Sequence, residues 1–263
     1  MFLKKFTASF NFIESTELRN EYSLDTSKFV RMVRSWGANL VGVGDVRQGL
    51  AKEFRHIPVA ISIAVAHPPV KDSIICKGSV TAYTNQFPQI DELLENIQKR
   101  IVSFLRSRGW KAFAIPPDTD KQDSSFAARL YPLFPHKTAA TCSGLGWVGK
   151  NGLLVSPDYG ARLSWGTVLT DGPLEVTREP YLKGECHGCN RCVNACPARA
   201  IRGVQWTRDI AGEPLVDIEK CALQMEYHRK VIGTCICAHC IMACPVGRGD
   251  KVLSLKINKI PTN

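Results

Sequence analysis

The sequence predicts an α+β fold in two parts, and three observations lead to this prediction. The chain has 263 residues, which exceeds the usual length of a single domain. Helical and strand-like patterns alternate up to about residue 178. Beyond it, short segments are punctuated by Cys, Gly and Pro and show little apolar periodicity. We therefore expect a mixed α/β domain over residues 1–178 and a small cysteine-rich domain over residues 179–263.

Two helices are predicted from apolar residues at helical spacing. Phe29, Val33 and Trp36 follow residues that favour a helix N-terminus, which predicts a helix over about 26–36. A second helix is predicted over 90–108, because four apolar residues share one face of it. These residues are Leu94, Ile97, Ile101 and Leu105.

Strands are predicted where apolar runs lie between turn residues. The expected strands cover residues 39–46, 58–66 and 110–115. A β-hairpin is expected to join 152–156 to 161–170, because the intervening Pro157-Asp158-Tyr159-Gly160 is a turn sequence. Residues 121–127 are expected to form a loop.

Composition and charge exclude several classes of protein. With 44% hydrophobic and 22% charged residues, the chain has the composition of a globular protein. The formal net charge of +10 is spread along the chain and forms no concentrated nucleic-acid patch. The longest apolar run is far below the roughly 20 residues that span a bilayer, and polar residues interrupt the N-terminus before a signal-peptide core. We expect a cytoplasmic protein with no membrane contact.

The cysteines are concentrated, since nine of the 11 lie from Cys186 to Cys244. Their odd number and the length of the chain disfavour a disulfide framework. The sequence CHGCNRCVNACP, from Cys186 to Pro197, is the C-x2-C-x2-C-x3-C-P run of bacterial ferredoxins. In this run three close thiolates bind one [4Fe–4S] cluster, and the fourth binds a second cluster. A zinc site would leave the third close cysteine and the Cys-Pro pair unexplained.

The motif recurs imperfectly downstream, which predicts a ferredoxin-like domain with two [4Fe–4S] clusters. Cluster 1 is predicted to take Cys186, Cys189, Cys192 and Cys244. Cluster 2 is predicted to take Cys196, Cys237, Cys240 and one further cysteine. Cys221 and Cys235 compete for that place. We favour Cys221, because Cys235 lies too close to Cys237 for the usual spacing, whereas Cys221 can come from a separate loop. Cys196 is expected at the start of a helical turn.

A glycine-rich segment precedes the cysteines and supplies candidate cofactor-binding residues. They are Gly144, Gly146, Trp147, Gly149, Lys150 and Asn151. The segment fits two phosphate-binding patterns, but Asn151 stands where the phosphate loop needs Ser or Thr, and Gly152 and Pro157 oppose a following helix. A nucleotide site is thus the weaker alternative. The glycines are expected to allow a close backbone approach to a flat or bulky group. The two remaining cysteines, Cys76 and Cys142, are interpreted as small buried hydrophobic residues, and Cys142 lies just before the glycine-rich segment.

The segment from Gly144 to Val155, the sequences DYG at 158–160 and VLTD at 168–171, and the following cysteine motifs resemble the epoxyqueuosine reductase family, which is related to reductive dehalogenases. The resemblance covers about residues 55–247 and is strongest from Lys137 to Cys196. It implies a catalytic α/β domain that binds a corrinoid such as cobalamin. It also implies that the ferredoxin domain passes on single electrons from a low-potential donor of the ferredoxin or flavodoxin type. The family's lone cysteine ahead of the second motif supports Cys221.

Two departures from the family concern the substrate. By ungapped counting, the family's proton-donating acid falls on Leu130, and the nearest titratable residues are His136 and Lys137. These two are the candidate catalytic residues. The sequence also lacks the helical-repeat tail of many family members, which is where tRNA contact is expected. Both departures argue against tRNA and leave a small molecule or an unknown substrate.

The competing hypothesis is a non-enzymatic electron carrier or adaptor, whose N-terminal domain docks a partner. The two hypotheses predict different surfaces. An enzyme should have a deep cavity that faces one cluster and is lined by the glycine-rich segment, whereas a carrier should expose a cluster edge on a flat surface.

Overall fold

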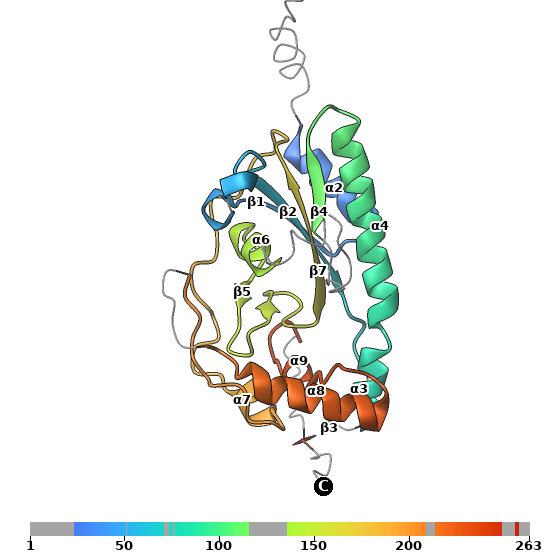
Figure 1. Ribbon diagram of the computed structural model, residues 1–263, viewed down its shortest axis with the longest axis vertical. Helices are drawn as coiled ribbons and strands as arrows, with labels where there is room; N and C mark the ends of the chain where they lie inside the picture. The colour runs from blue at the N-terminus through green and yellow to red at the C-terminus, as the bar shows by residue number, and fades with distance from the viewer. Residues whose placement is uncertain are drawn as a thin grey trace, which may run out of the picture.

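The computed structural model describes residues 24–50, 52–70, 74–75, 77–115, 136–208, 214–248 and 256–257. A β-sheet with flanking helices occupies one end of the molecule, and the cysteine-rich segments occupy the other end (Figure 1). The predicted α+β class is confirmed. No described helix is long and apolar enough to cross a membrane. The expected loop over 121–127, the family acid position Leu130 and Cys76 lie outside the described residues.

The main sheet has the strand order β1-β2-β7-β4, and all its neighbouring strands are antiparallel. The strands are β1 (Leu40–Asp45), β2 (Val59–Ala66), β4 (Ala112–Ile115) and β7 (Leu163–Thr170). Their apolar, β-branched residues favour extended backbone, and the central β2 is buried on both faces. The three strands predicted over 39–46, 58–66 and 110–115 are confirmed.

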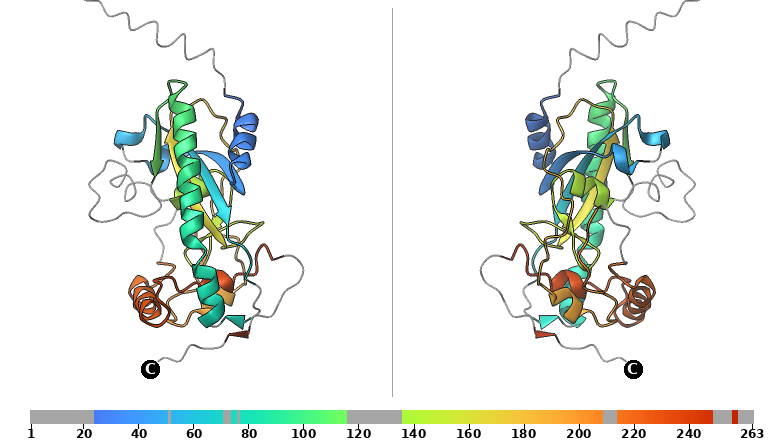
Figure 2. Two further views of the ribbon diagram at one scale, coloured as in Figure 1. Left: turned by 90° about the vertical axis from the view of Figure 1, so that its right-hand side faces the viewer. Right: turned by 90° about the vertical axis from the view of Figure 1, so that its left-hand side faces the viewer.

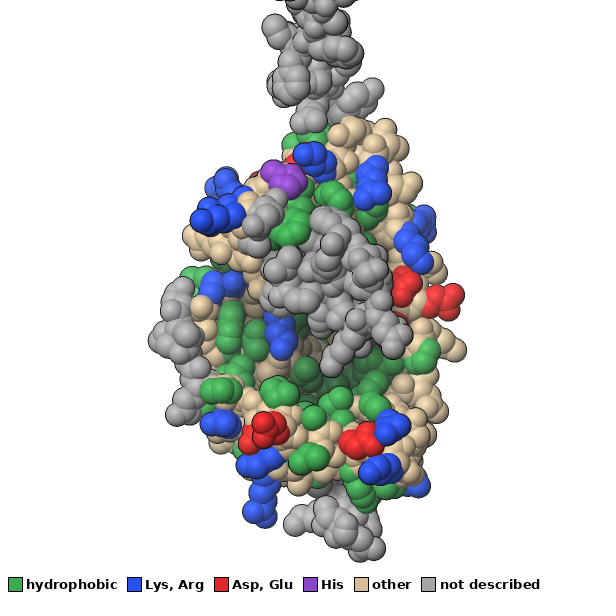
Figure 3. Space-filling model, viewed as in Figure 1, with side chains coloured by type: hydrophobic (Ala, Val, Ile, Leu, Met, Phe, Trp, Pro, Cys, Tyr) green, Lys and Arg blue, Asp and Glu red, His purple; other side chains and the backbone are tan. Residues whose placement is uncertain are grey.

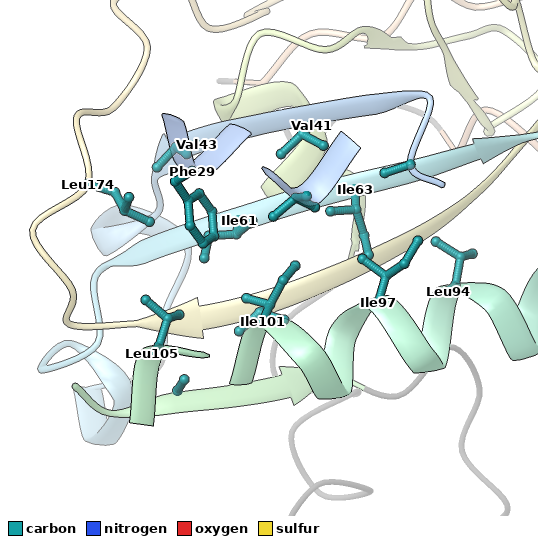
Figure 4. Close-up of a cluster of buried hydrophobic side chains, with 14 of the residues drawn as sticks. Phe29, Val41, Val43, Ile61, Ile63, Leu94, Ile97, Ile101, Leu105 and Leu174 are labelled. Carbon is teal, nitrogen blue, oxygen red and sulfur yellow. The ribbon is translucent and has the colours of Figure 1, made fainter. Parts of the chain in front are cut away.

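One face of the sheet is covered by α2 (Thr26–Ser35) and α4 (Phe87–Arg106), which confirms both predicted helices. Asp25 caps α2 by accepting a hydrogen bond from the Lys28 backbone. Helix α4 starts three residues before the predicted position 90, because Phe87 and Pro88 are favourable in a first helical turn. Its apolar face points toward Ile61 and Ile63 of β2 (Figure 4). Burial of each such side chain contributes about 1.5–3 kcal/mol to folding.

The other face of the sheet carries α6 (His136–Cys142), whose Ala139 and Ala140 are fully buried. Two glycines of β1 make this packing possible. A Cβ on Gly44 would lie 2.6 Å from the Cys142 carbonyl carbon, and one on Gly42 would meet Leu145 at 2.8 Å. The end of α6 therefore lies directly against the β1 backbone.

The predicted hairpin between 152–156 and 161–170 is wrong. Strand β6 (Leu154–Val155) pairs instead with β5 (Trp147–Val148), and the turn forms only a single bridge between Ser156 and Gly160. The residues that follow enter the main sheet as β7, between β2 and β4. A two-stranded hairpin cannot bury both faces of a strand, whereas the main sheet buries Val168 and Leu169 completely.

The cysteine-rich end contains three helices and is joined by α3 from the N-terminal part (Figures 1 and 2). The three described helices are α7 (Arg191–Ala195), α8 (Ile218–Ile232) and α9 (His239–Met242), and α3 spans Lys77–Thr84. The shorter elements are the 3-10 helices η1 (Arg47–Gly49) and η2 (Lys52–Phe54) and the parallel pair of β3 (Ile74–Ile75) with β8 (Lys256–Ile257). The domain boundary near residue 178 stays a prediction.

Candidate metal centre and adjoining cavity

The two cysteine motifs form matching local structures. Each of the helices α7 and α9 begins two residues after one predicted ligand, carries a second ligand at its second position and ends one or two residues before a third. The first set is Cys189, Cys192 and Cys196, and the second is Cys237, Cys240 and Cys244. The repeat in the sequence therefore corresponds to a repeat in the structure.

Cys196 lies at the end of a helical turn and not at its start, which corrects the expectation from the sequence. Its backbone is extended, with ψ of 111°, because the ring of Pro197 disfavours helical geometry in the residue before it. The thiol of Cys196 accepts a hydrogen bond from the Ala200 backbone at 3.3 Å.

The structure brings together the four cysteines predicted for cluster 1. Burial and then the neighbouring thiolates of Cys186, Cys244 and Cys189 together raise the pKa of Cys192 to about 11. Cys244 is itself buried. Such a group of mutually repelling thiolates needs a cation or a metal cluster among them to stay deprotonated.

A second group comprises the cysteines predicted for cluster 2. Burial raises the pKa of Cys237 to about 11, and the thiolates of Cys196 and Cys221 contribute to the rise. The pKa of Cys240 is raised by burial and then by neighbouring thiolates, which include Cys237, Cys196 and Cys221. Cys221 comes from helix α8 and not from a loop as expected. Cys235 is exposed and takes no part in this group of described cysteines.

The surroundings of the two groups fit iron–sulfur clusters. Four soft thiolates per group are the usual ligand set of a [4Fe–4S] cluster. Tyr83, Trp147 and His228 have buried polar atoms without a hydrogen-bond partner among the described residues. Trp147 packs with Cys186 and Cys244, and a His228 ring nitrogen lies within 4.8 Å of the Cys237 Sγ. The sulfides of a cluster are acceptors for such donors.

Arg162 connects the sheet to the first cysteine group. Its guanidinium, just before β7, donates to the carbonyl oxygens of Cys244 at 2.9 Å and Val246 at 2.6 Å. The turn residue Gly160 has φ of +60° and packs its Cα against the Val246 carbonyl, where a side chain has no room. This contact fixes Cys244 relative to β7.

The glycine-rich segment lies between the sheet and the first cysteine group. A Cβ on Gly149 would stand 3.6 Å from the Cys186 Sγ, and the buried Lys150 Nζ donates to Asn190 Oδ1 at 2.9 Å. Gly144 and Gly146 approach the chain's own backbone, at Glu179 and Val155. The close approach of these glycines thus packs the segment against other parts of the chain and not against a cofactor. Among the six predicted cofactor-binding residues, only Asn151 lines the cavity described next.

A cavity of about 510 Å³ opens between α6, the β5–β6 turn and α8. Figure 3 shows this face hollowed between the sheet and α8, with apolar side chains inside the hollow. Lys137, Asn151 and Cys221 all line it, so the cavity reaches the second cysteine group. The remaining lining residues that the argument uses are Thr138, Leu153, Arg208 and Ile218.

The two predicted catalytic residues are placed differently. Lys137 is solvent-accessible in the cavity, and the protein around its ammonium lowers its pKa. His136 does not line this cavity, and its Nδ1 lies 2.9 Å from the Thr167 Oγ1 of the sheet. The geometry thus favours Lys137 over His136 as a group that meets a substrate.

Arg208 is a site residue that no sequence pattern indicated. Its Nη2 donates to Thr141 Oγ1 at 2.6 Å and to the Tyr181 carbonyl at 3.1 Å. It separates the cavity from a second, more polar cavity of about 620 Å³, which Cys142 lines. Burial raises the pKa of Cys142, and Arg208 opposes this rise. A single arginine outside any motif does not indicate in the sequence that its side chain lines a cavity.

Comparison with known proteins supports an iron–sulfur site at the first cysteine motif. A family model described as a 4Fe-4S binding domain matches residues 180–202. The chain is 32% identical over 120 residues to an epoxyqueuosine reductase of Lactococcus garvieae, which covers 42% of this chain and 31% of that protein. It is 48% identical over 65 residues to an epoxyqueuosine reductase of Synechocystis sp., covering 25% and 22%. The match thus spans less than a third of the length of either relative.

Solved structures have the same fold. An epoxyqueuosine reductase from Streptococcus thermophilus aligns with a TM-score of 0.53 at 20% identity, over 86% of this chain and 67% of that chain. The catabolic reductive dehalogenase NpRdhA aligns with a TM-score of 0.58 at 19% identity, over 84% of this chain and 32% of that chain. The resemblance predicted from the glycine-rich segment and the cysteine motifs is confirmed.

Proposed function

The chain is related to the epoxyqueuosine reductase family, and on this premise we propose that it is an iron–sulfur oxidoreductase of the reducing cytoplasm. The observation that carries the proposal is the cavity between α6 and α8, because it is lined both by a cluster-ligand candidate, Cys221, and by titratable Lys137. A protein that only carries electrons needs no such cavity next to a cluster.

We assign the cluster ligands as the two groups of cysteines suggest. Cluster 1 is held by Cys186, Cys189, Cys192 and Cys244, and cluster 2 by Cys196, Cys221, Cys237 and Cys240. The clusters supply one-electron carriers between a low-potential donor of the ferredoxin or flavodoxin type and the cavity. The exposed position of Cys235 supports its exclusion.

The cavity is proposed to hold a corrinoid such as cobalamin. Its lining is mainly apolar with a few polar groups, which suits a large flat cofactor with polar edges. The structure of a reductive dehalogenase with the same fold is described as suggesting a mechanism for B12-dependent dehalogenation. A corrinoid supplies a metal centre that accepts single electrons. Asn151 and Arg208 would bind the polar edge, and Lys137 would hold the proton given to the substrate.

The substrate is proposed to be a small molecule that enters beside Lys137. A tRNA substrate is the second candidate, because one solved relative is an epoxyqueuosine reductase bound to an epoxyqueuosine-modified tRNA-Tyr stem loop. The position of that family's acid falls on Leu130, outside the described residues. Lys137 is therefore the proton donor to be tested with either substrate class.

Anaerobic reconstitution tests the clusters. The full chain should bind about eight irons with eight sulfides. Replacement of Cys221 by Ser should cost about four of these irons, and the matched replacement Cys235→Ser should cost none. Loss of iron only from the Cys235 variant would reverse the ligand assignment. A count of about four irons in the wild type would mean that the chain binds one cluster and not two.

Addition of cobalamin to the reconstituted protein tests the enzyme against the carrier. Retention of cobalamin on the protein, with a changed absorption spectrum, is expected. An unchanged spectrum and no retention would favour the electron carrier.

Replacement of Lys137 tests the proton donor. The Lys137→Met variant should bind cobalamin normally, but its substrate turnover should fall about 100-fold or more, as for loss of a general acid. The His136→Gln variant should change turnover little.

A further inference from the structure

Two buried histidines lie beside Cys237, and the first of them contacts it directly. The His239 Nδ1 lies 3.0 Å from the Cys237 carbonyl oxygen and 3.3 Å from its Sγ. Once Cys237 is a thiolate ligand, both of these atoms are acceptors only. The proton of His239 must therefore be on Nδ1, which donates to the carbonyl oxygen and, at a longer distance, to the thiolate.

The second histidine lacks any hydrogen-bond partner among the described residues. His228 of α8 is 1% exposed, and neither of its ring nitrogens has a hydrogen bond there. Its ring meets that of His239 edge to face, with centroids 5.4 Å apart. The ligand atoms of His228, Cys237 and His239 lie within 4.8 Å of one another. A buried N–H is unfavourable without an acceptor, and a cluster held by Cys237 brings sulfur acceptors to this place.

The first cysteine group has different surroundings. The position of α7 that matches His239 in α9 is Arg191, because each follows a predicted ligand by two residues. The histidine of the first motif, His187, is exposed, and its Nε2 lies 3.0 Å from the Glu185 Oε2. Among the described residues, buried imidazoles are thus found at the second group and not at the first.

We propose that His228 and His239 each donate an N–H to a sulfur of cluster 2 and thereby raise its reduction potential. The inference rests on the proposed function, since it needs cluster 2. A one-electron reduction adds one negative charge to a cluster, and N–H donors stabilise the reduced form more than the oxidised form. In this step a low-potential one-electron donor is oxidised and cluster 2 is reduced, while both protons remain on their nitrogens.

The consequence is a direction for electron flow within the chain. Cys221, a proposed ligand of cluster 2, lines the cavity. The two N–H donors thus favour the reduced form of the cluster that borders the cavity. The two histidines are positioning residues in this sense, because they act through the cluster and touch no substrate.

A redox titration of the reconstituted full chain, followed by electron paramagnetic resonance, tests the proposal. The variants are His239→Leu and His228→Leu, with the exposed His187→Leu as the matched control. Either buried-histidine variant should keep its iron and show about a tenfold lower ratio of reduced to oxidised cluster 2 at a fixed potential. For a one-electron couple this is a shift of about 59 mV to more negative potential. The His187 variant should leave cluster 2 unchanged.

A measurement on the wild type keeps the test valid if a variant fails to fold. Electron–nuclear double resonance on protein with ¹⁵N-labelled histidine should show weak nitrogen couplings to cluster 2, as hydrogen bonds give. Strong coupling, which indicates a nitrogen bound directly to iron, would overturn the proposal. Unchanged potentials in both variants would also overturn it. So would a metal ion other than iron that the wild type binds and both variants lose, because the histidines would then be its ligands. Absence of iron from the wild type would instead refute the proposed function, and the inference with it.

Discussion

At the scale of single residues, Gly149 is needed for packing within the protein, although its motif suggests that it makes room for a bound ligand. A Cβ at this position would lie 2.8 Å from both the Asn151 Oδ1 and the Val155 Cγ2. The substitution Gly149→Ala should therefore destabilise the protein by about 1–3 kcal/mol, as over-packing does. The control is Gly188→Ala in the first cysteine motif, where nothing lies within 4 Å of a new Cβ. Anaerobic thermal unfolding should show a lower Tm for the first variant only, and equal Tm values would contradict the packing argument.

His67 makes the stability depend on pH. Its burial lowers its pKa to about 4, and its Nε2 lies 3.0 Å from the Ser164 Oγ. The unfolded chain takes up a proton below about pH 6.5 and the folded chain does not, so stability is full above pH 6.5 and falls as the pH falls toward 4. From pH 7 to pH 5 the loss should be about 2 kcal/mol. The unfolding free energy of His67→Gln, measured over the same range, should lack this part of the slope.

At the scale of elements, the sequence is informative where a helix or strand buries an apolar face. Helix α4 was predictable because Leu94 and Ile101 bury one stripe of it. Helix α8 was not, because His228 is its only fully buried residue while Ile218 and Leu223 are exposed. Its Asp217 cap and the Gly233 end, with φ of +79°, are signals that a search for apolar periodicity overlooks. The missed helix is the one that carries Cys221.

The link between β7 and the cysteine-rich end depends on Arg162. Its two N–H groups bind two carbonyls in a fork that lysine cannot reproduce. Arg162→Lys should lose one of the two bonds and about 1.5–3 kcal/mol, since a hydrogen bond from a charged donor has this strength. Hydrogen exchange should become faster around residues 244–248. The exposed Arg31→Lys should change nothing, and equal protection in both variants would show that the fork is dispensable.

At the scale of the whole molecule, the cavity results from segments that no local pattern connects. Lys137, Asn151 and Cys221 come from α6, the β5–β6 turn and α8. The cysteine spacing predicted two clusters because three ligands of cluster 1 and two of cluster 2 are close in sequence. Arg208 and the cavity could not be predicted in this way, because their position depends on how β7 and α8 are placed. The misassigned hairpin of β7 shows the same dependence on distant partners.

The last prediction tests whether this cavity is where a cofactor binds. Leu153 lines the cavity, and Leu153→Trp would fill part of its 510 Å³ with an indole ring. Leu223→Trp is the matched control, because Leu223 lies on α8 at 72% exposure and outside the cavity lining. If cobalamin binds in the cavity, the Leu153 variant should lose at least about tenfold in affinity, or about 1.4 kcal/mol. Iron content should be unchanged in both variants, so cobalamin binding separates from cluster assembly. Equal cobalamin affinity in the two variants would place the cofactor elsewhere in the molecule.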